Sequence, residues 1–405
     1  MIPFSPPRMD DKIIAEVTDT LKSGWITTGP KTKRFEILLA DYAQVPAVLC
    51  TSAATTGLEL MLRWFGVTKG DEVIIPAYTY CATANVVMHC GAKPVMVDSL
   101  PDSFNLDPKL VKNAITKRTK VIIPVDIGGF PSDYDALNAI IRENEIHNQF
   151  TPNTDVQSKL GRILLLSDAA HSLGAKYRGK PIGSQADITV FSFHAVKNLT
   201  TAEGGAIALN LPKPFEHEAI YKWLNILSLH GQSKDALAKT TGSWRYDVVC
   251  AGYKANMTDI QASIGLVELE RYDSDTLVRR KQIVDAYHHA FCDDERFETP
   301  VTDTKDKQSS YHLYQLKIIN ISEAERDEII QEIFNQEVSV NVHFQPLPLL
   351  THYKNLGYNM RNYPNAWLHY SREISLPVYY DLTDKQIQIV ISAVKQAVEK
   401  CLSND

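Results

Sequence analysis

The chain has 405 residues, of which 44% are hydrophobic and 22% are charged, and its formal net charge is -6. A chain of this length can bury a large core and exceeds one ordinary small domain, so we expect a large α/β domain and a smaller one. No run of five or more like charges is present, which argues against nucleic acid as a partner.

Seven short β-rich runs lie between residues 47 and 210, and most of them are almost wholly apolar. Such strands are covered on both faces, and helix-length segments separate several of them. The pattern therefore predicts a mostly parallel, seven-stranded sheet flanked by helices. The runs are AVLC (47–50), EVIIP (72–76), PVMVD (94–98), KVIIPVD (120–126), ILLLSD (163–168), ITVFSF (188–193) and AIALN (206–210).

Other parts of the first three quarters of the chain carry helical or irregular patterns. Leu58, Met61, Leu62 and Phe65 follow the first run and form one apolar helical stripe. Residues 140–160 are polar and mostly aperiodic, which predicts a surface excursion. From residue 211 to about 290 the pattern is helical, and the stretch from Thr258 onward must hold one or two helices.

The last hundred residues mix short strands with helices. The runs HLYQLKII and VSVNVHF are predicted as strands, and a capping-box pattern at 383–386 begins the last helix. We therefore expect a large domain over residues 1–290, including the N-terminal segment, and a small α+β domain over residues 291–405.

The N-terminus and the cysteines indicate the compartment. The start, MIPFSPPRMDDK, lacks the basic residues and the apolar core of a signal peptide, and no stretch approaches 18 uninterrupted apolar residues. The six cysteines show no CxxC spacing, which favours free thiols in a reducing compartment. We expect a soluble, cytoplasmic protein with no membrane partner.

Candidate site residues follow the predicted strands, because ligands bind outside the carboxyl ends of the strands of an open parallel sheet. The run TSAATT (51–56), which includes Ser52 and Ala53, follows the first strand at a predicted helix N-terminus, where free N–H groups favour phosphate. A plain N-cap explains these residues equally well. Tyr80 follows the second strand and could lay its ring on a planar ligand, although tyrosines at strand ends are more often simply packed.

Two further strands end in a carboxylate and an amine. Asp168 ends the run ILLLSD, and a buried carboxylate needs a cationic partner, although a helix N-cap role competes with that interpretation. Lys197 follows ITVF, five residues after Ser192. Most lysines there are solvated, yet a lysine held in a site can form a Schiff base with an aldehyde. An anion site, an aromatic ring, a carboxylate and an amine at one edge of the sheet match the phosphate, the flat ring, the ring nitrogen and the aldehyde of pyridoxal phosphate.

The sequence also resembles the DegT/DnrJ/EryC1/StrS sugar aminotransferases, a branch of the fold-type I pyridoxal-phosphate enzymes. The resemblance runs through most of the chain, and its most specific part is SFHAVKNLTTAEGGAI (192–207). The other matching stretches are IPF near the start, SGWITTGPKTKRFE (23–36), GDEVIIPAYTYCATANVV (70–87), SDAAHSLGAKYRGKPIG (167–183), GYKANMTDIQASIGLVELERYD (252–273) and SLPVYYDLT (375–383).

The resemblance implies the fold of type I pyridoxal-phosphate transferases and assigns roles to the candidate residues. It implies that Lys197 forms the Schiff base with the cofactor and that Asp168 pairs with the pyridinium nitrogen. The other cofactor contacts that it implies are Tyr80 stacked on the ring, Ser52, Ala53 and Ser192 on the phosphate, and His171 near the ring hydroxyl.

The sequence departs from the family pattern at a few of these positions. The family commonly has Gly-Thr at 53–54, Gln at His171 and Glu at Ser167, which puts the side-chain contacts to the phosphate and to the ring hydroxyl in question. Ala202 replaces a frequent glycine.

The resemblance further implies a homodimer with a shared active site, in which an asparagine of the second subunit completes the phosphate site. Asn256 in GYKANMTD is the candidate. Lys254 occupies the neighbouring slot, where many relatives carry asparagine, and it is the alternative.

The function that the resemblance implies is transfer of an amino group from an amino acid, with glutamate expected, to a nucleotide-linked keto sugar. A 4-keto-6-deoxy hexose for polysaccharide or glycan synthesis is expected. Pyridoxamine phosphate carries the amine between the two half-reactions, and Lys197 moves the proton in each half.

Several alternatives are kept beside this interpretation. A sugar dehydratase of the same family replaces the lysine by histidine, whereas this chain keeps Lys197. A carbon–sulfur lyase needs a mobile cysteine, for which Cys81 is the candidate. A non-catalytic, cofactor-binding regulator lacks support from a helix-turn-helix or a basic stripe. The histidines and cysteines show no metal-ligand spacing, so no metal is expected.

Overall fold

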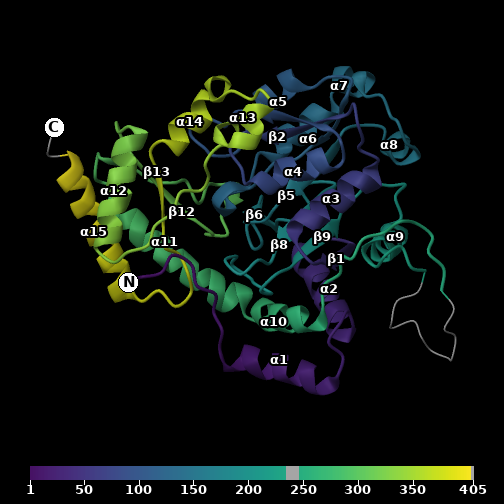
Figure 1. Cartoon of the computed structure of the whole chain (residues 1–405), viewed down its shortest axis with the longest axis horizontal. Helices are drawn as coiled ribbons and strands as arrows, with labels where there is room; N and C mark the ends of the chain where they lie inside the picture. The colour runs from purple at the N-terminus through teal and green to yellow at the C-terminus, as the bar shows by residue number, and fades with distance from the viewer. Residues whose placement is uncertain (234–245, 403–405) are drawn as a thin grey trace.

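A seven-stranded sheet forms the centre of the larger part of the molecule (Figure 1). The computed structural model describes residues 1–233 and 246–402. The strand order is β1-β9-β8-β5-β4-β2-β3; β9 runs antiparallel to both of its neighbours, and the other pairs are parallel. The strands are β1 (Ala47–Thr51), β2 (Glu72–Pro76), β3 (Lys93–Val97), β4 (Thr119–Ile122), β5 (Leu164–Asp168), β8 (Ile188–Ser192) and β9 (Gly205–Leu209). The predicted sheet is thereby confirmed.

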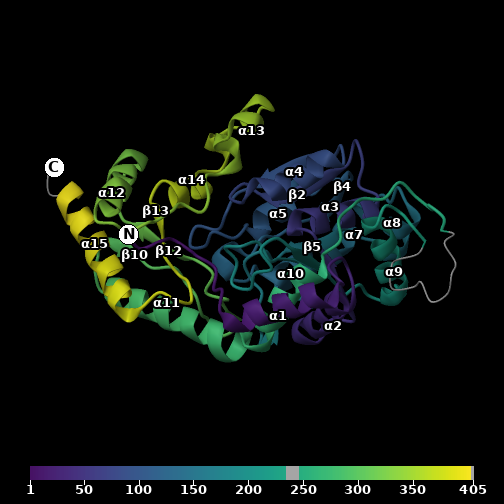
Figure 2. The ribbon, with the colours of Figure 1, turned by 60° about the horizontal axis from the view of Figure 1, so that its bottom comes forward.

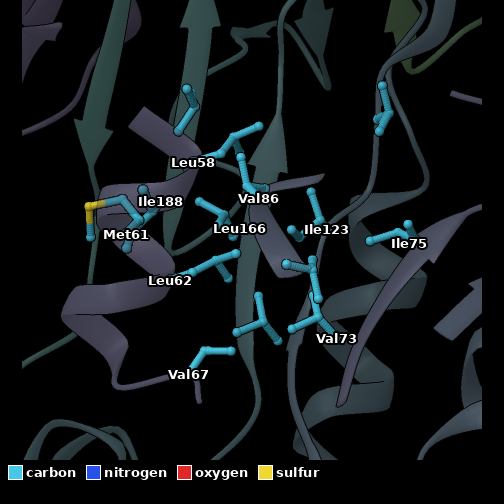
Figure 3. Packing of buried hydrophobic residues seen from close by; sticks show 14 of the residues in the cluster. Leu58, Met61, Leu62, Val67, Val73, Ile75, Val86, Ile123, Leu166 and Ile188 are labelled. Carbon is cyan, nitrogen blue, oxygen red and sulfur yellow. The ribbon is translucent and has the colours of Figure 1, made fainter. Parts of the chain in front are cut away.

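Successive strand residues point to opposite faces, and each face carries its own hydrophobic core. In β2, Val73 and Ile75 belong to one buried cluster, whereas Ile74 belongs to the other. Figure 3 shows the first cluster, in which Leu58 and Leu62 pack over the strands. This two-sided burial explains why the runs are apolar at every position rather than at alternate ones.

Helices cover both faces of the sheet. The first core takes side chains from α3 (Ala54–Phe65), α4 (Cys81–His89) and α9 (His217–Ser228). The second takes them from α2 (Pro30–Ala43), α5 (Pro108–Ala114), α6 (Tyr134–Arg142) and α10 (Asp259–Glu270), and α1 (Asp11–Ser23) packs against α10. The arrangement is a three-layer α/β fold.

Two regions differ from, or refine, the sequence-based expectation. The expected surface excursion contains α7 (Asn144–Gln149) and α8 (Asp155–Leu160), and the amide of the buried Gln157 donates to the carbonyl of Phe65. The stretch after Thr258 is two helices: α10 continues through a π-helical turn (Tyr272–Thr276) into α11 (Leu277–Phe291). Part of the region expected to be helical, residues 234–245, lies outside the described residues.

A second, smaller core lies at the C-terminal end of the chain. The strands β10 (Phe297–Glu298), β12 (Tyr314–Ile318) and β13 (Glu373–Leu376) form an antiparallel sheet, which packs with α11, α12 (Glu323–Asn335) and α15 (Asp384–Leu402). Figure 2 shows α11 leading from the large sheet to these helices. The capping box at Thr383 is confirmed by its reciprocal bonds with Gln386. The domain boundary at residue 290 stays a prediction.

The expected strand VSVNVHF is wrong. Its residues make only isolated bridges, Val338 with Ile2 and Asn341 with Ser375. The third strand of the small sheet is β13 instead. The segment 338–344 runs from the small sheet toward the larger one. Just after it, the N–H of Leu347 donates to the carbonyl of Ala77.

Short elements complete the described chain. The strands β6 (Lys176–Tyr177), β7 (Lys180–Pro181) and β11 (Lys307–Gln308) form a small sheet, and α13 (Thr351–Asn355) and α14 (Pro364–Tyr370) precede β13. Within residues 1–233 and 246–402, no helix has the length and apolar character needed to cross a membrane.

The core position of Leu62 gives a test of the fold. Leu62 on α3 is fully buried, so Leu62→Ala should lower the free energy of unfolding by about 2–5 kcal/mol, because the cavity that remains is only partly refilled. Ile389→Ala on α15, whose side chain is 42% exposed, should change it by less than about 0.5 kcal/mol. Urea denaturation followed by circular dichroism measures both, and equal losses would contradict this packing.

Candidate active site

A cavity of about 390 Å³ lies at the carboxyl ends of the central strands. Its walls come from the loops after these strands, from the start of α3, and from the C-terminal part of the chain. Six of the predicted site residues line it, namely Ala53, Tyr80, Asp168, His171, Ser192 and Lys197. The sheet topology thus brings together residues from four separate strand ends.

Lys197 lies half-buried in the loop that follows β8. Its backbone N–H donates to the carbonyl of His194 at 2.9 Å, which turns the chain back toward the sheet. Its amine makes no hydrogen bond or ion pair within the described residues. Burial lowers the pKa of Lys197 to about 8, and the nearby Asp168 carboxylate opposes that shift. A lysine with such a pKa can give up its proton near neutral pH.

Asp168 ends β5, and its carboxylate is buried at the cavity wall. Oδ2 accepts the hydroxyl of Thr83 at 2.9 Å, and Oδ1 accepts the backbone N–H of Ala170 at 3.3 Å. Burial raises the pKa of Asp168, because these two bonds and the Lys197 amine only partly replace water. No cation in the described residues forms an ion pair with it, so the carboxylate can take a cationic ligand.

A polar network fixes the strand ends beneath Asp168. The fully buried Asp126 accepts the backbone N–H of Ser132 at 2.8 Å and the hydroxyls of Tyr134 and Ser172 at 2.9 and 2.7 Å. Ser167, where the family usually has Glu, lies 2.6 Å from the Tyr134 hydroxyl. The negative charge of Asp126 also raises the pKa of Asp168, and a cationic ligand would relieve that repulsion.

The N-terminus of α3 forms the opposite end of the cavity. Its N-cap residue, Ala53, makes no side-chain cap bond, so the N–H groups of the first turn are left for a ligand. Ala53, Ala54 and Thr55 line the cavity together with Ser192. At Gly205, a Cβ would lie 2.4 Å from the backbone nitrogen of Ala54, so glycine is required for this close approach.

Aromatic rings form the remaining walls. Tyr80 lies at the N-terminus of α4 with its side chain 60% exposed, and its ring centroid is 5.8 Å from that of Phe344. His171 is buried and stacks on Phe344 at 5.7 Å, and its Nδ1 accepts the N–H of Gly128 at 3.2 Å. Burial lowers the pKa of His171 well below its usual range, so the ring is neutral.

Two predicted residues do not line the cavity. The N–H of Ser52 donates to the carbonyl of Ala255 at 2.8 Å, and its hydroxyl lies 3.4 Å from that of Thr56. Asn256 forms a backbone bridge with Thr51, and its amide donates to Thr28 at 2.6 Å. The roles of both residues, like those of the six that line the cavity, stay predictions.

The expected site residues did not include those that the C-terminal part contributes. His312, His343 and Phe344 line the cavity, as do Phe4 and Ser5 of the N-terminal segment. No spacing links these residues to the strand ends, because they reach the cavity through the packing of distant elements. Thr55 belongs to the run TSAATT (51–56) that the sequence placed at this helix N-terminus, although it was not among the expected cofactor contacts.

The residues of the cavity fit pyridoxal phosphate. An uncapped helix end and a serine hydroxyl suit the phosphate, and a buried carboxylate without an ion-pair partner in the described chain suits a protonated ring nitrogen. An unpaired lysine amine in the same cavity suits the aldehyde. Cys81, the cysteine that a carbon–sulfur lyase would need, is not among the lining residues, although its neighbours Tyr80 and Ala82 are lining residues.

The chain is similar to known proteins along its whole length. It matches the DegT/DnrJ/EryC1/StrS aminotransferase family over residues 7–148 and 153–395. The spore coat polysaccharide biosynthesis protein SpsC of Bacillus subtilis is 36% identical over 405 residues, covering 98% of this chain and 97% of that protein.

Solved structures agree with this match. The putative sugar aminotransferase Spr1654 from Streptococcus pneumoniae, in its PMP form, superposes with a TM-score of 0.95 at 49% identity, over 99% of this chain and 100% of that one. The same protein is also solved in a PLP form. Helicobacter pylori PseC, an aminotransferase involved in the biosynthesis of pseudoaminic acid, gives a TM-score of 0.86 at 26% identity, over 98% and 99% of the two chains.

The fold and the cavity together define a pyridoxal-phosphate-dependent aminotransferase of fold type I. The chain belongs to the DegT/DnrJ/EryC1/StrS aminotransferase family. The expected resemblance to the sugar aminotransferases of this family is thereby confirmed, as is the expected cofactor.

Asp168→Asn tests the buried carboxylate. Because burial raises the pKa of Asp168, its ionised form destabilises the cofactor-free chain at neutral pH. The variant without cofactor should therefore melt higher than the wild type at pH 7, and this gain should shrink as the pH falls toward the ordinary aspartate pKa of 3.8. With cofactor, amino transfer should slow by about a hundredfold or more, because the amide cannot keep the ring nitrogen protonated. Calorimetry and single-turnover kinetics measure the two effects, and a lower melting temperature without cofactor would contradict the assignment.

Proposed function

We propose that the enzyme transfers the amino group of an amino acid, glutamate, to a nucleotide-linked keto sugar of the 4-keto-6-deoxy hexose kind. The product would enter polysaccharide or other glycan synthesis. One observation carries the proposal: an unpaired lysine amine and a buried carboxylate without an ion-pair partner in the described chain border one cavity. The printed names of SpsC and PseC, which concern polysaccharide and pseudoaminic acid biosynthesis, support the sugar acceptor.

Lys197 performs the proton transfers in this proposal. When bound, pyridoxal phosphate supplies an aldehyde that carries the amino group and a protonated ring that withdraws electrons from the reacting carbon. The Lys197 amine removes the proton from the α-carbon of the amino acid and, in the second half-reaction, returns a proton to the former keto carbon of the sugar. A pKa of about 8 allows both roles near neutral pH, because the two protonation states are close in free energy.

Other residues hold the ligand in place. Asp168 keeps the proton on the ring nitrogen, and the network around Asp126 fixes that carboxylate at the strand end. The N–H groups at the start of α3 and the Ser192 hydroxyl bind the phosphate, and Tyr80 covers the ring. Because Nδ1 of the neutral His171 accepts the N–H of Gly128, the ring proton is on Nε2, which can donate a hydrogen bond to the ring hydroxyl.

A homodimer would complete the phosphate site. The partner subunit's Asn256 is the expected contact, and Lys254 is the alternative. Within one chain, Asn256 is outside the cavity and adjacent to Thr51 at the end of β1. An asparagine in this place can serve a neighbouring subunit if the two-fold axis runs beside this edge of the sheet.

Lys197→Ala tests the central assignment. In the wild-type holoenzyme, glutamate should abolish the visible absorbance of the lysine-bound cofactor, and a keto-sugar nucleotide should restore it. The variant should never show that absorbance, and its turnover should fall by about a thousandfold or more, because no other amine replaces the lost base.

The control is Lys385→Ala, which removes an exposed lysine near the start of α15, outside the cavity lining. It should keep the wild-type absorbance and rate. An unchanged spectrum in Lys197→Ala would refute the role of Lys197. A wild-type enzyme that reacts with glutamate but with no keto-sugar nucleotide would refute the proposed acceptor.

A further inference from the structure

His343 is held in the cavity wall on three sides. Its Nδ1 lies 2.9 Å from the hydroxyl oxygen of Ser375, and the ring of Phe4 stacks on it at 5.3 Å. Its carbonyl accepts bonds of 2.6 Å from the Tyr78 hydroxyl and from the Gln315 amide. Nε2 has no hydrogen-bond partner among the described residues, and His343 lines the cavity. A ring fixed in this way presents one free nitrogen to a ligand.

Behind His343 lies a hydrogen-bonded relay. The Ser375 hydroxyl donates to Oε1 of Glu373, and Oε2 of the same carboxylate accepts the backbone N–H of His343 at 3.0 Å. Glu373 and Ser375 both lie on β13, and neither has any exposed surface. The carboxylate therefore touches the histidine twice, once directly and once through the serine.

The protonation state of Glu373 decides which ring nitrogen of His343 carries its proton. When Glu373 is ionised, the single Ser375 proton points to the carboxylate, so Nδ1–H must donate to Ser375 and Nε2 is a bare acceptor. When Glu373 takes up one proton from solvent, its O–H donates to Ser375, the serine donates to Nδ1, and Nε2 carries the proton. The relay holds one more proton in the second arrangement than in the first.

The charges around Glu373 favour the protonated arrangement at neutral pH. Burial raises the pKa of Glu373 to about 8, although Ser375, the His343 N–H and the Arg326 guanidinium stabilise the ionised form. Arg326 on α12 donates to the backbone carbonyl of Glu373 at 3.2 Å. Lys317, its register partner on β12, is bound to Glu298 instead.

The ring of His343 itself stays neutral throughout this range. Burial, with the nearby Lys197 amine, lowers the pKa of His343 to about 3, so only its two neutral tautomers occur. The other titratable groups near the ring are His171 and His312 across the cavity, whose pKa values burial also lowers, and the Tyr78 phenol, whose pKa burial raises.

An amino-acid substrate brings a carboxylate into this cavity, and a carboxylate only accepts hydrogen bonds. The described lining contains one lysine, Lys197, and no arginine. Nε2–H of His343 is therefore a suitable donor, and it exists only while the relay holds its extra proton. A sugar hydroxyl can pair with either tautomer, because it both donates and accepts.

We propose that Glu373 is a positioning residue that, through Ser375, places a proton on Nε2 of His343, and that this N–H binds a carboxylate of the amino-acid substrate. The proposal rests on the proposed function, because it assumes an amino-acid donor. The carboxylate would then bind together with one proton, while sugar binding would be nearly independent of the relay.

Glu373→Gln fixes the relay in one arrangement. The backbone N–H of His343 needs an acceptor, so the amide oxygen takes the place of Oε2 and the amide NH₂ faces Ser375. The serine must then donate to Nδ1, and Nε2 keeps its proton at every pH. Ser375→Ala is the matched control, because Glu373 still ionises but is no longer connected to Nδ1.

The experiment measures inhibition of each holoenzyme by glutarate, whose two carboxylates stay ionised from pH 7 to pH 9. For the wild type, the inhibition constant should rise about tenfold over this range, the ratio expected when one proton with a pKa of about 8 must be bound. Glu373→Gln should remove that rise and keep the neutral-pH value. KM for the sugar should change less than about twofold in the variant.

Nitrogen NMR on ¹⁵N-histidine-labelled holoenzyme reads the tautomer directly, with His343 assigned by its loss in His343→Gln. The wild-type proton should move from Nε2 to Nδ1 as the pH rises, and in Glu373→Gln it should stay on Nε2. A tenfold rise that persists in Ser375→Ala would overturn the relay, because it would show that the charge of Glu373 acts through space. An unchanged tautomer in the wild type would overturn it as well.

The two proposals fail in different ways. If glutarate does not inhibit and glutamate does not react, the amino-acid donor is refuted, while the NMR result still decides whether Glu373 controls His343. If glutamate reacts normally and the inhibition constant of the wild type is independent of pH, the carboxylate contact at His343 is refuted, while the transfer reaction stands.

Discussion

A buried carboxylate without an ion-pair partner in the described chain is the constraint on which the site depends. Asp168 sits at the end of a central strand, where two hydrogen bonds and a nearby lysine only partly compensate for lost water. In the proposed function, the ring nitrogen of the cofactor supplies the cation that offsets this unfavourable charge. Asp168 is itself buried, and so is the neighbouring hydrogen-bonded network of Asp126, Tyr134 and Ser167, so little water reaches the carboxylate. Under that proposal, Asp168 would strengthen cofactor binding and lower the stability of the cofactor-free chain.

The two parts of the chain contribute different chemistry to the cavity. The strand ends of the large sheet supply charged and small groups, namely the carboxylate, the amine and the open helix end. The C-terminal part and the N-terminal segment supply neutral rings, among them His312, His343 and Phe4. Burial keeps these imidazoles uncharged, which suits the proposed substrates, an anionic amino acid and then a hydroxyl-rich sugar.

The sequence predicted the large sheet and most of its chemistry, because strands buried on both faces leave a strong local signal and their carboxyl ends coincide. Lys197 and Asp168 were found in this way. The signal failed where position depends on distant packing: VSVNVHF alternates like a strand, yet β13 takes the place beside β12, and His343 reaches the cavity only through that arrangement. Ser52 precedes α3 and Thr55 lies in its first turn, and only the start of the helix at Ala54 decides which of them borders the cavity.

The antiparallel course of β9 has a consequence for how this enzyme can vary. Ser192 pairs with Gly205 at the end of β8 and the start of β9. The loop between them, which carries Lys197, is therefore held at both ends by this strand pair. Gly205 is in turn wedged against the start of α3, and Ala202 adopts a left-handed φ of 67° at the place where relatives favour glycine. Inserting or deleting even one residue in this loop would move the Lys197 amine away from the position proposed for the cofactor aldehyde. We therefore expect substrate choice to change through the segments that enter the cavity from outside the sheet, and the length of this hairpin to stay constant.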